Sequence, residues 1–169
     1  LYILLSFLYV MVGKMIINKD FVEKAMEHLI IFHDRIIFHS GGLTGVRDEG
    51  GLYNSVYKIF TYLEKPEIDA ASVGAFVYKE LARRHHFNDG NKRTAHAFAK
   101  LFLYFMNSHL KVEYKDAVSF IIEIAKYESK VTSNEIKEWV KSHLTELPHQ
   151  DLERYLNETI LDIQYGYQK

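Results

Sequence analysis

An all-α fold is predicted by three features of this 169-residue sequence. Only two prolines, Pro66 and Pro148, interrupt it. Between the turn signals, apolar residues recur three or four positions apart, which is the spacing of helices buried on one face. Strand potential is confined to residues 111–114. Because 48% of the residues are hydrophobic and 25% are charged, we expect one compact helical domain with a substantial core.

The turn residues divide the first half of the chain into three predicted helices, over residues 18–37, 52–60 and 72–83. Asn18 and Ser72 are the expected N-caps, because short polar side chains accept hydrogen bonds from the free amides of a first helical turn. Five glycines within residues 40–51 predict a loop between the first two helices.

Four helices are predicted in the second half, over residues 92–105, 117–125, 132–144 and 152–163. A polar break that contains Gly90 precedes the first of them. Thr132 and Glu135 have the spacing of a capping box, in which each side chain accepts from the backbone amide of the other residue. The apolar stripe along each helix predicts that the helices pack on a shared core.

Residues 1–14 differ from these helices in being almost entirely apolar. The run is shorter than the roughly 20 residues that a membrane-spanning helix needs, and it lacks the basic leader and cleavage site of a secretory signal. We interpret it as a gene-start artefact or a tag-like extension, with Met15 as the natural start. The alternative is a short segment that anchors the protein to a membrane or docks it on a partner.

The composition excludes several classes of function. The net charge is −1 and no run of Lys and Arg is dense, so neither nucleic acid nor a membrane surface is an expected partner. Because the chain has no cysteine, disulfide scaffolds, cysteine nucleophiles and thiolate zinc sites are excluded. The lack of cysteine fits a cytoplasmic location.

The densest concentration of reactive side chains lies in the segment His85 to Thr94, between two predicted helices. The start of the second helix presents unpaired amides and the positive end of the helix dipole, which together bind anions. Gly90 allows close approach of the backbone, and Asn91 tolerates the same backbone region. Lys92 and Arg93 add positive charge suited to phosphate oxygens.

Two further residues complete a set suited to phosphate chemistry. Asp89 is placed to hold a divalent cation next to the anion site. A histidine side chain titrates near neutral pH, so a histidine at the end of the preceding helix, where His85 and His86 stand, can accept the proton of an attacking hydroxyl. The alternative is an ordinary helix–loop–helix corner, with Phe87 as a buried plug and with solvated charges. The number of compatible roles within ten residues favours the functional interpretation.

The pattern His-x-Phe-x-Asp-Gly-Asn-Lys-Arg at residues 85–93 resembles the core motif of the Fic/Doc family, and most of all its Doc branch of bacterial toxins. Phe32-His33-Asp34 in the first helix and the glycine-rich stretch 41–48 also resemble Doc. The resemblance covers residues 15–144 as a Fic/Doc-like domain, which leaves residues 145–169 as a helical extension. It implies a compact helical bundle whose central helix–loop–helix carries the active site, with a short β-hairpin flap as an optional feature.

The resemblance also implies an ATP-dependent enzyme that modifies a hydroxyl side chain of a protein. Family members use ATP and Mg²⁺, with the histidine as base, the acidic residue on the metal and the loop on the phosphates. These roles fall on His85 as base, on Asp89 as metal ligand and, for the nucleotide, on Phe87, Gly90, Asn91, Lys92 and Arg93. A Doc-like toxin would phosphorylate a translation factor such as elongation factor Tu, and an antitoxin protein would restrain it.

Two positions of the motif point to different reactions. Lysine at position 92 is typical of Doc, which transfers the γ-phosphate, whereas AMP transferases have glycine there. Glycine at position 90 is usual in the AMP transferases, whereas Doc has alanine. We expect phosphate transfer, with transfer of AMP as the alternative.

Two other interpretations compete with this one. An HD-type metal phosphohydrolase would use His33-Asp34, but it would leave the Gly90–Arg93 loop without a role, so we expect a structural pair that supports the active site. A catalytically silent binding module has no need of the intact motif. His86 stands where Fic proteins usually have proline, and we interpret it as a neighbour that packs or meets solvent. A further hypothesis is that the final helix, 149–165, covers the region where an antitoxin binds.

Overall fold

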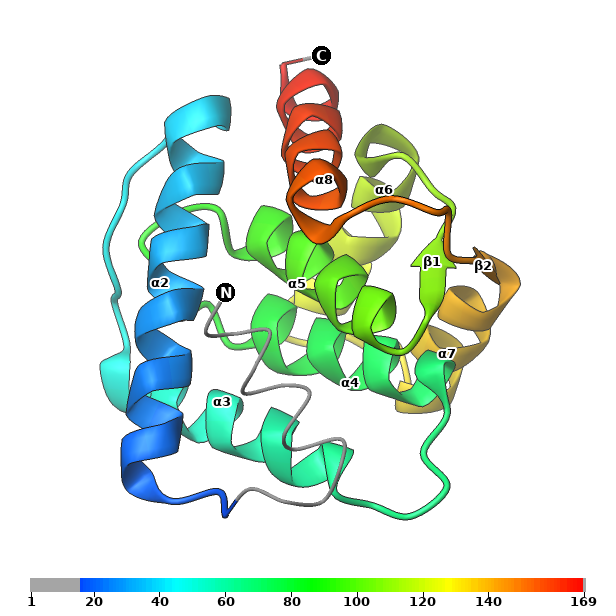
Figure 1. The fold of residues 1–169 in the computed structure, drawn as a ribbon. Coiled ribbons are helices and arrows are strands. Elements are labelled where there is room, and N and C mark those ends of the chain that lie inside the picture. The colour runs from blue at the N-terminus through cyan, green and yellow to red at the C-terminus, as the bar shows by residue number, and fades with distance from the viewer. Residues whose placement is uncertain (1–15, 169) are drawn as a thin grey trace.

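The computed structural model describes residues 16–168, so the interpretation of residues 1–14 concerns a part of the chain outside it. The described elements are, in order, α2 (Lys19–Ser40), α3 (Glu49–Leu63), α4 (Ala70–Arg83), α5 (Asn91–Phe105), β1 (Ser108–Leu110), α6 (Tyr114–Ala125), α7 (Ser133–Ser142), β2 (Leu144–Glu146) and α8 (Leu152–Tyr167). The predicted all-α fold is confirmed (Figure 1).

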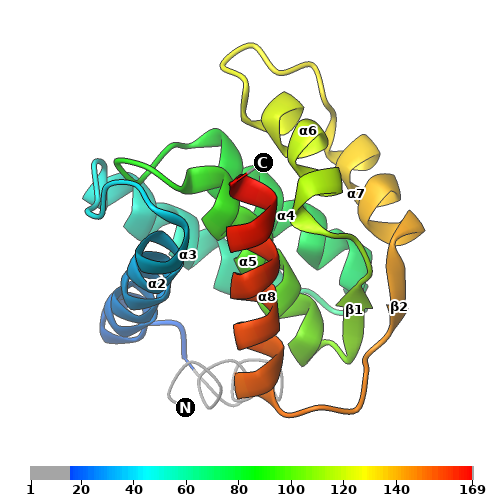
Figure 2. The ribbon, with the colours of Figure 1, turned by 90° about the horizontal axis from the view of Figure 1, so that it is seen from above.

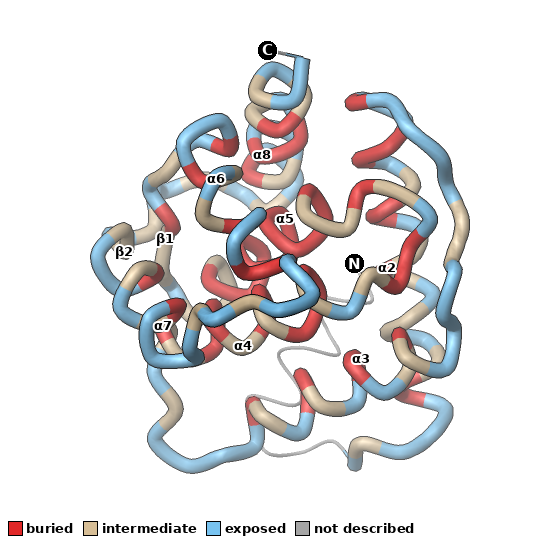
Figure 3. Tube along the Cα trace, turned by 180° about the vertical axis from the view of Figure 1, so that it is seen from behind, coloured by how far each residue is buried: buried red, intermediate tan, exposed pale blue. Residues whose placement is uncertain are grey.

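Helices α4 and α5 lie at the centre of the bundle (Figure 1). Every residue of α5 from Arg93 to Leu103 is buried, so this helix is enclosed on all sides. Helix α8 packs against α2, α5 and α6, and seen from above it lies between α2 and α6 (Figure 2). Buried residues concentrate on the central helices and on the inner faces of the outer ones (Figure 3). The start of α5 therefore lies deep in the fold.

Local side chains determine where several helices begin. The Asn18 side chain accepts from the Phe21 amide at 2.9 Å, as predicted, and the capping box of Thr132 and Glu135 is formed. The prediction of Ser72 as a cap was wrong. Asp69 caps α4, and its carboxylate accepts from the amide of Ser72 at 2.7 Å. Because Asp69 stands three residues earlier, its carboxylate reaches a free amide of the first turn.

The small sheet lies where the sequence did not predict strands. β1 pairs antiparallel with β2, so that Leu110 is opposite Leu144. Residues 111–114, which had strand potential, follow β1, and Tyr114 already begins α6. Leu144 was expected in a helix but belongs to β2. Both errors have one cause, since a pairing between distant segments leaves no mark on local periodicity.

None of the helices in residues 16–168 is long and apolar enough to cross a membrane.

Candidate active site

The loop between α4 and α5 has a left-handed residue near each end. Gly90 has a φ of 69° and directly precedes the first residue of α5. The positive φ favours glycine, and a Cβ atom at position 90 would lie 2.5 Å from Cδ1 of Ile37 on α2, so a side chain there would require Ile37 to shift. His85 has a φ of 50°, which is uncommon for a residue with a side chain. The neighbours of His85 must therefore hold it in this conformation.

The Asn91 side chain stabilises the loop by bonding to the backbone of Phe87. Its Oδ1 accepts from the amide of Phe87 and its Nδ2 donates to the carbonyl of Phe87, both at 2.9 Å. The buried ring of Phe87 stacks on His33, with 3.8 Å between ring centroids. The side chains of Phe87 and Asn91, both predicted to contact a nucleotide, are therefore engaged within the protein and shape the loop.

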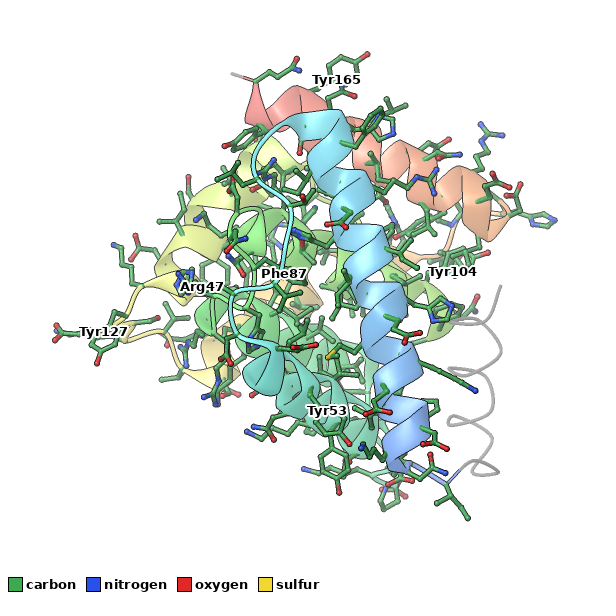
Figure 4. The ribbon with its side chains drawn as sticks, turned by 90° about the vertical axis from the view of Figure 1, so that its left-hand side faces the viewer. Arg47, Tyr53, Phe87, Tyr104, Tyr127 and Tyr165 are labelled. Atoms are coloured by element: carbon green, nitrogen blue, oxygen red, sulfur yellow. The ribbon has the colours of Figure 1, made fainter. Side chains whose placement is uncertain are left out.

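The glycine-rich stretch 41–48 runs alongside the loop between α4 and α5, which we call the candidate loop. It stabilises this loop through contacts with the loop backbone. Val46 forms an isolated antiparallel bridge with Phe87, and Arg47 donates from Nη2 to the carbonyl of His85 at 2.6 Å. Arg47 and Phe87 are labelled on this side of the molecule in Figure 4. The amide of Asn88 donates to the carbonyl of Gly45 at 3.0 Å. Within the described residues, this stretch forms a loop with one bridge where the resemblance allowed a β-hairpin flap.

His85 is partly exposed, and its ring points toward the end of α6. Nε2 lies 3.0 Å from the carbonyl oxygen of Ala125. Because a carbonyl oxygen only accepts, this contact assigns the ring proton to Nε2 and the lone pair to Nδ1. His85 also lines a surface cavity of about 310 Å³ together with four cationic side chains, Lys79, Arg83, Arg84 and Lys126.

Arg93 and Asp89 form an ion pair at the other end of the segment. Nη2 of Arg93 lies 3.0 Å from Oδ1 of Asp89. Nη1 of Arg93 donates to Ser40 Oγ at 2.5 Å and to the carbonyl of Gly41 at 2.6 Å. Burial tends to raise the pKa of Asp89, but the Gly90 amide and the Arg93 guanidinium outweigh it, so this pKa is lowered. The Arg93 side chain is only 2% exposed.

The C-terminal end of α8 covers Arg93. The guanidinium carbon of Arg93 lies 4.0 Å from the centre of the Tyr167 ring, a cation–π contact. Gly166 allows this approach, since a Cβ atom there would lie 2.9 Å from the backbone nitrogen of Lys115 on α6. Arg93 was predicted to bind phosphate. Its contacts in the structure are with α2, Asp89 and α8.

Lys92 and Asp89 are the more accessible charged residues of the segment from His85 to Thr94. Lys92 is partly exposed in the first turn of α5, and the Asp89 side chain is 39% exposed. Among residues 16–168, no group of three or more histidine or carboxylate side chains could hold a metal by itself. Mg²⁺ is commonly bound by one or two carboxylates together with substrate phosphates. Asp89 therefore fits Mg²⁺ as the protein ligand of a phosphate-bound ion.

Two buried histidines lie directly behind the loop. Nδ1 of His33 is 2.8 Å from Oγ1 of Thr94, and burial lowers the pKa of His33 to about 4, although the Asp34 carboxylate raises it in part. His86 is 1% exposed and bonds to Ser55, so it packs inside the fold. No local signal could have assigned these roles, because the partners lie 61 and 31 residues away along the chain.

Comparison with known proteins gives a family match and a curated relative. Residues 23–103 match the family model for the Fic/DOC family. Over 78 residues, the chain is 41% identical to "Protein kinase doc" of Escherichia phage P1. Both comparisons show that the chain is similar to the Fic/Doc family.

The Fic/Doc match has limits that bear on the site. The aligned region is 46% of this chain and 62% of the length of the phage protein. The family match contains α3, α4, most of α2 and most of α5, and with them the whole segment from His85 to Thr94. Helices α6, α7 and α8 lie beyond it, so Tyr167 and Ala125, which contact Arg93 and His85, come from outside the matched residues.

Proposed function

We propose that this protein is a Doc-like toxin that uses Mg-ATP to phosphorylate a hydroxyl side chain of a target protein. The match to the Fic/DOC family model and the similarity to a Doc kinase support this function. The observation that carries it is the placement of His85 and Asp89 on the loop before α5 and of Arg93 in the first turn of α5.

His85 is the proposed general base. Its Nδ1 accepts the proton of the target hydroxyl while the hydroxyl oxygen forms a bond to the γ-phosphorus of ATP. The bond between that phosphorus and the β,γ-bridging oxygen breaks, and ADP leaves. The carbonyl of Ala125 holds Nε2–H and so orients the imidazole, as a third group orients the base in other catalytic sites.

The start of α5 is the proposed phosphate site. The first amides of the helix, with Lys92 and Arg93, carry positive potential toward the nucleotide. Asp89 would hold Mg²⁺, which neutralises phosphate charge when bound. For Arg93 to contact phosphate, its guanidinium must exchange part of its bonding to Asp89 and part of its contact with Tyr167 for ligand oxygens.

The proposed choice between phosphate and AMP transfer depends on two residues of the motif, Gly90 and Lys92. Gly90 was the feature that favoured AMP transfer, but its φ of 69° also favours glycine, and a Cβ atom there would require the Ile37 side chain to shift. The backbone conformation therefore gives a reason for this glycine that does not depend on the reaction. Lys92 remains as the discriminating residue and supports phosphate transfer, with AMP transfer as the second candidate.

The proposed target is a translation factor of the elongation factor Tu type, and its modification would block translation in the cytoplasm. An antitoxin protein is the proposed partner that restrains the enzyme. Both proposals rest on the similarity to Doc.

The deciding experiment is incubation of the purified protein with Mg-ATP and a bacterial extract, followed by intact-mass analysis of the modified proteins. We expect a phosphate-sized addition on a translation factor. An AMP-sized addition would select the second candidate, and the absence of both would refute the proposed activity.

His85→Ala is the essential variant in this experiment. Loss of a general base lowers the rate by about 100- to 10,000-fold. His149→Ala, which changes an exposed histidine in the linker before α8, is the matched control and should leave the rate unchanged. An unchanged rate in His85→Ala would rule out His85 as the base.

A further inference from the structure

Three polar side chains lie together in the core directly behind His85. Glu80 comes from α4, Ser55 from α3, and His86 from the candidate loop itself. Their exposed fractions are 5%, 1% and 1%. Ser55 Oγ lies 3.1 Å from Oε2 of Glu80 and 2.9 Å from Nε2 of His86. The three residues therefore form a continuous hydrogen-bonded chain across three segments of the fold.

The hydrogen bonds of this chain have one direction. An ionised carboxylate only accepts, so the Ser55 hydroxyl donates its single proton to Glu80. The Ser55 oxygen must then accept from His86, which assigns the imidazole proton to Nε2. Burial lowers the pKa of His86, and the Asp48 and Glu80 carboxylates offset only part of this effect, so the ring is neutral at pH 7. Such an arrangement selects one rotamer of His86.

The backbone of His86 is held as firmly as its side chain. The carbonyl of His86 accepts from the amides of Arg47 at 2.7 Å and Asp48 at 3.1 Å. The preceding residue, His85, is in the left-handed conformation. A side-chain-bearing residue keeps such a backbone only where its surroundings over-determine it, and strain of this kind clusters at functional sites. Anchoring His86 on both sides restricts the peptide that joins it to His85.

We propose that Glu80, Ser55 and His86 form a positioning chain that sets the direction of the His85 imidazole. All three side chains are buried, so we infer that they act through the backbone of the loop. An apolar cluster could fill the same space, but it would not select one rotamer of His86, whereas directional hydrogen bonds do. The role in catalysis rests on the proposed function, while the effect on the His85 ring does not depend on it.

Ser55→Ala is the first test, because it removes the central hydroxyl and leaves Glu80 and His86 without their shared partner. We expect kcat to fall about 10- to 100-fold, since displacement of a catalytic group by about 1 Å has effects of this size. KM for ATP should stay unchanged, because Lys92 and Arg93 are not altered. The imidazole resonance of His85 in the NMR spectrum should shift or broaden. Ser55→Thr keeps the hydroxyl and should restore both values.

A matched control separates positioning from general loss of stability. Tyr78→Phe breaks another buried hydrogen bond of α4, the 2.6 Å contact of Tyr78 with His96, away from the candidate loop. It should lower the melting temperature without changing kcat or the His85 resonance. If Ser55→Ala does not fold, Glu80→Leu tests the same chain, because it removes the acceptor for the Ser55 hydroxyl and leaves a side chain of similar size. It should lower kcat and shift the His85 resonance as Ser55→Ala does.

The possible outcomes distinguish this proposal from the proposed function. If folded Ser55→Ala keeps both kcat and the His85 resonance of the wild type, the positioning chain is refuted. The same conclusion follows if Tyr78→Phe lowers kcat equally. If the wild-type protein modifies no substrate, the proposed function fails, and the His85 resonance in Ser55→Ala alone decides whether the chain positions the ring.

Discussion

The two ends of the segment from His85 to Thr94 are held in opposite ways. At the first end, His85 is partly exposed beside a cavity. Its Nε2 bonds to the carbonyl of Ala125, whereas its Nδ1 takes no part in that bond. At the other end, the Arg93 guanidinium is almost fully enclosed by α2, Asp89 and Tyr167. The difference indicates that the proposed base is ready to meet a substrate, whereas the proposed phosphate ligand must first exchange partners.

Arg93→Ala should have the largest effect on stability, at the end of the segment where the Arg93 guanidinium is enclosed. It removes the ion-pair partner of Asp89, and the Ser40 hydroxyl and the Gly41 carbonyl lose the donor that Arg93 supplies. We expect the free energy of unfolding to fall by about 3 kcal/mol, because removing one partner of a buried ion pair costs ~3–5 kcal/mol and Asp89 is partly in water. Denaturant unfolding measures this loss.

Arg154→Ala is the control for this prediction. Arg154 pairs with Glu158, also four residues away, but both side chains are exposed. Exposed pairs of this kind contribute about 0.3–0.5 kcal/mol. Equal losses in the two variants would show that Arg93 is not held as the structure indicates.

The pH dependence of stability tests the packing behind the loop. Burial lowers the pKa of His33 from its ordinary value of 6.5 to about 4, although the Asp34 carboxylate raises it in part. Between these values the unfolded chain binds a proton that the folded protein does not, so stability should decrease as the pH falls from 6.5 to 4. The decrease from His33 should reach about 3 kcal/mol.

His33→Asn identifies the source of this pH dependence. The variant keeps a polar group that can bond to Thr94 and removes the titrating ring, so the slope should become smaller. Some slope will remain, because burial also lowers the pKa of His86 and His96. Measurement of unfolding at several pH values compares the two proteins, and an identical slope in both would contradict the assignment to His33.

Tyr167→Ala should have the smallest effect of these substitutions. It removes the ring that covers the Arg93 guanidinium. A cation–π contact contributes about 0.5–2 kcal/mol, so its removal should raise the affinity for ATP by about 2- to 30-fold. Tyr167→Phe keeps the aromatic ring and should bind ATP as the wild type does. Calorimetric titration with a non-hydrolysable ATP analogue and Mg²⁺ measures both. Equal affinity in the wild type and Tyr167→Ala would show that α8 does not restrict the site.

Local patterns predicted much of the fold and failed at identifiable places. The cap at Asn18 and the capping box at Thr132 were predictable, because each involves side chains and amides three residues apart. The pairing of Leu110 with Leu144 was not, because strand partners lie far apart in the sequence. The candidate loop was located from its composition, but the inward orientation of Asn91 was not visible there.

The two adjacent histidines show which part of the site local sequence patterns could not predict. His85 and His86 are the same residue type in consecutive positions, and only the resemblance to the Fic/Doc motif selected His85 as the base. The structure separates them by environment, since His85 meets the end of α6 and His86 enters the core. The partners Ala125 and Ser55 lie 40 and 31 residues away, beyond the reach of local patterns.

By itself, the sequence determined that this protein is helical and that one loop carries a histidine, a carboxylate and cations before a helix start. Helical periodicity and loop composition are local properties, so they can be read from neighbouring residues. Only the tertiary structure decided that Arg93 is enclosed by Ser40 and Tyr167, and that the carbonyl of His85 accepts a hydrogen bond from Arg47. Burial and hydrogen-bond partners arise from segments that meet only when the chain folds.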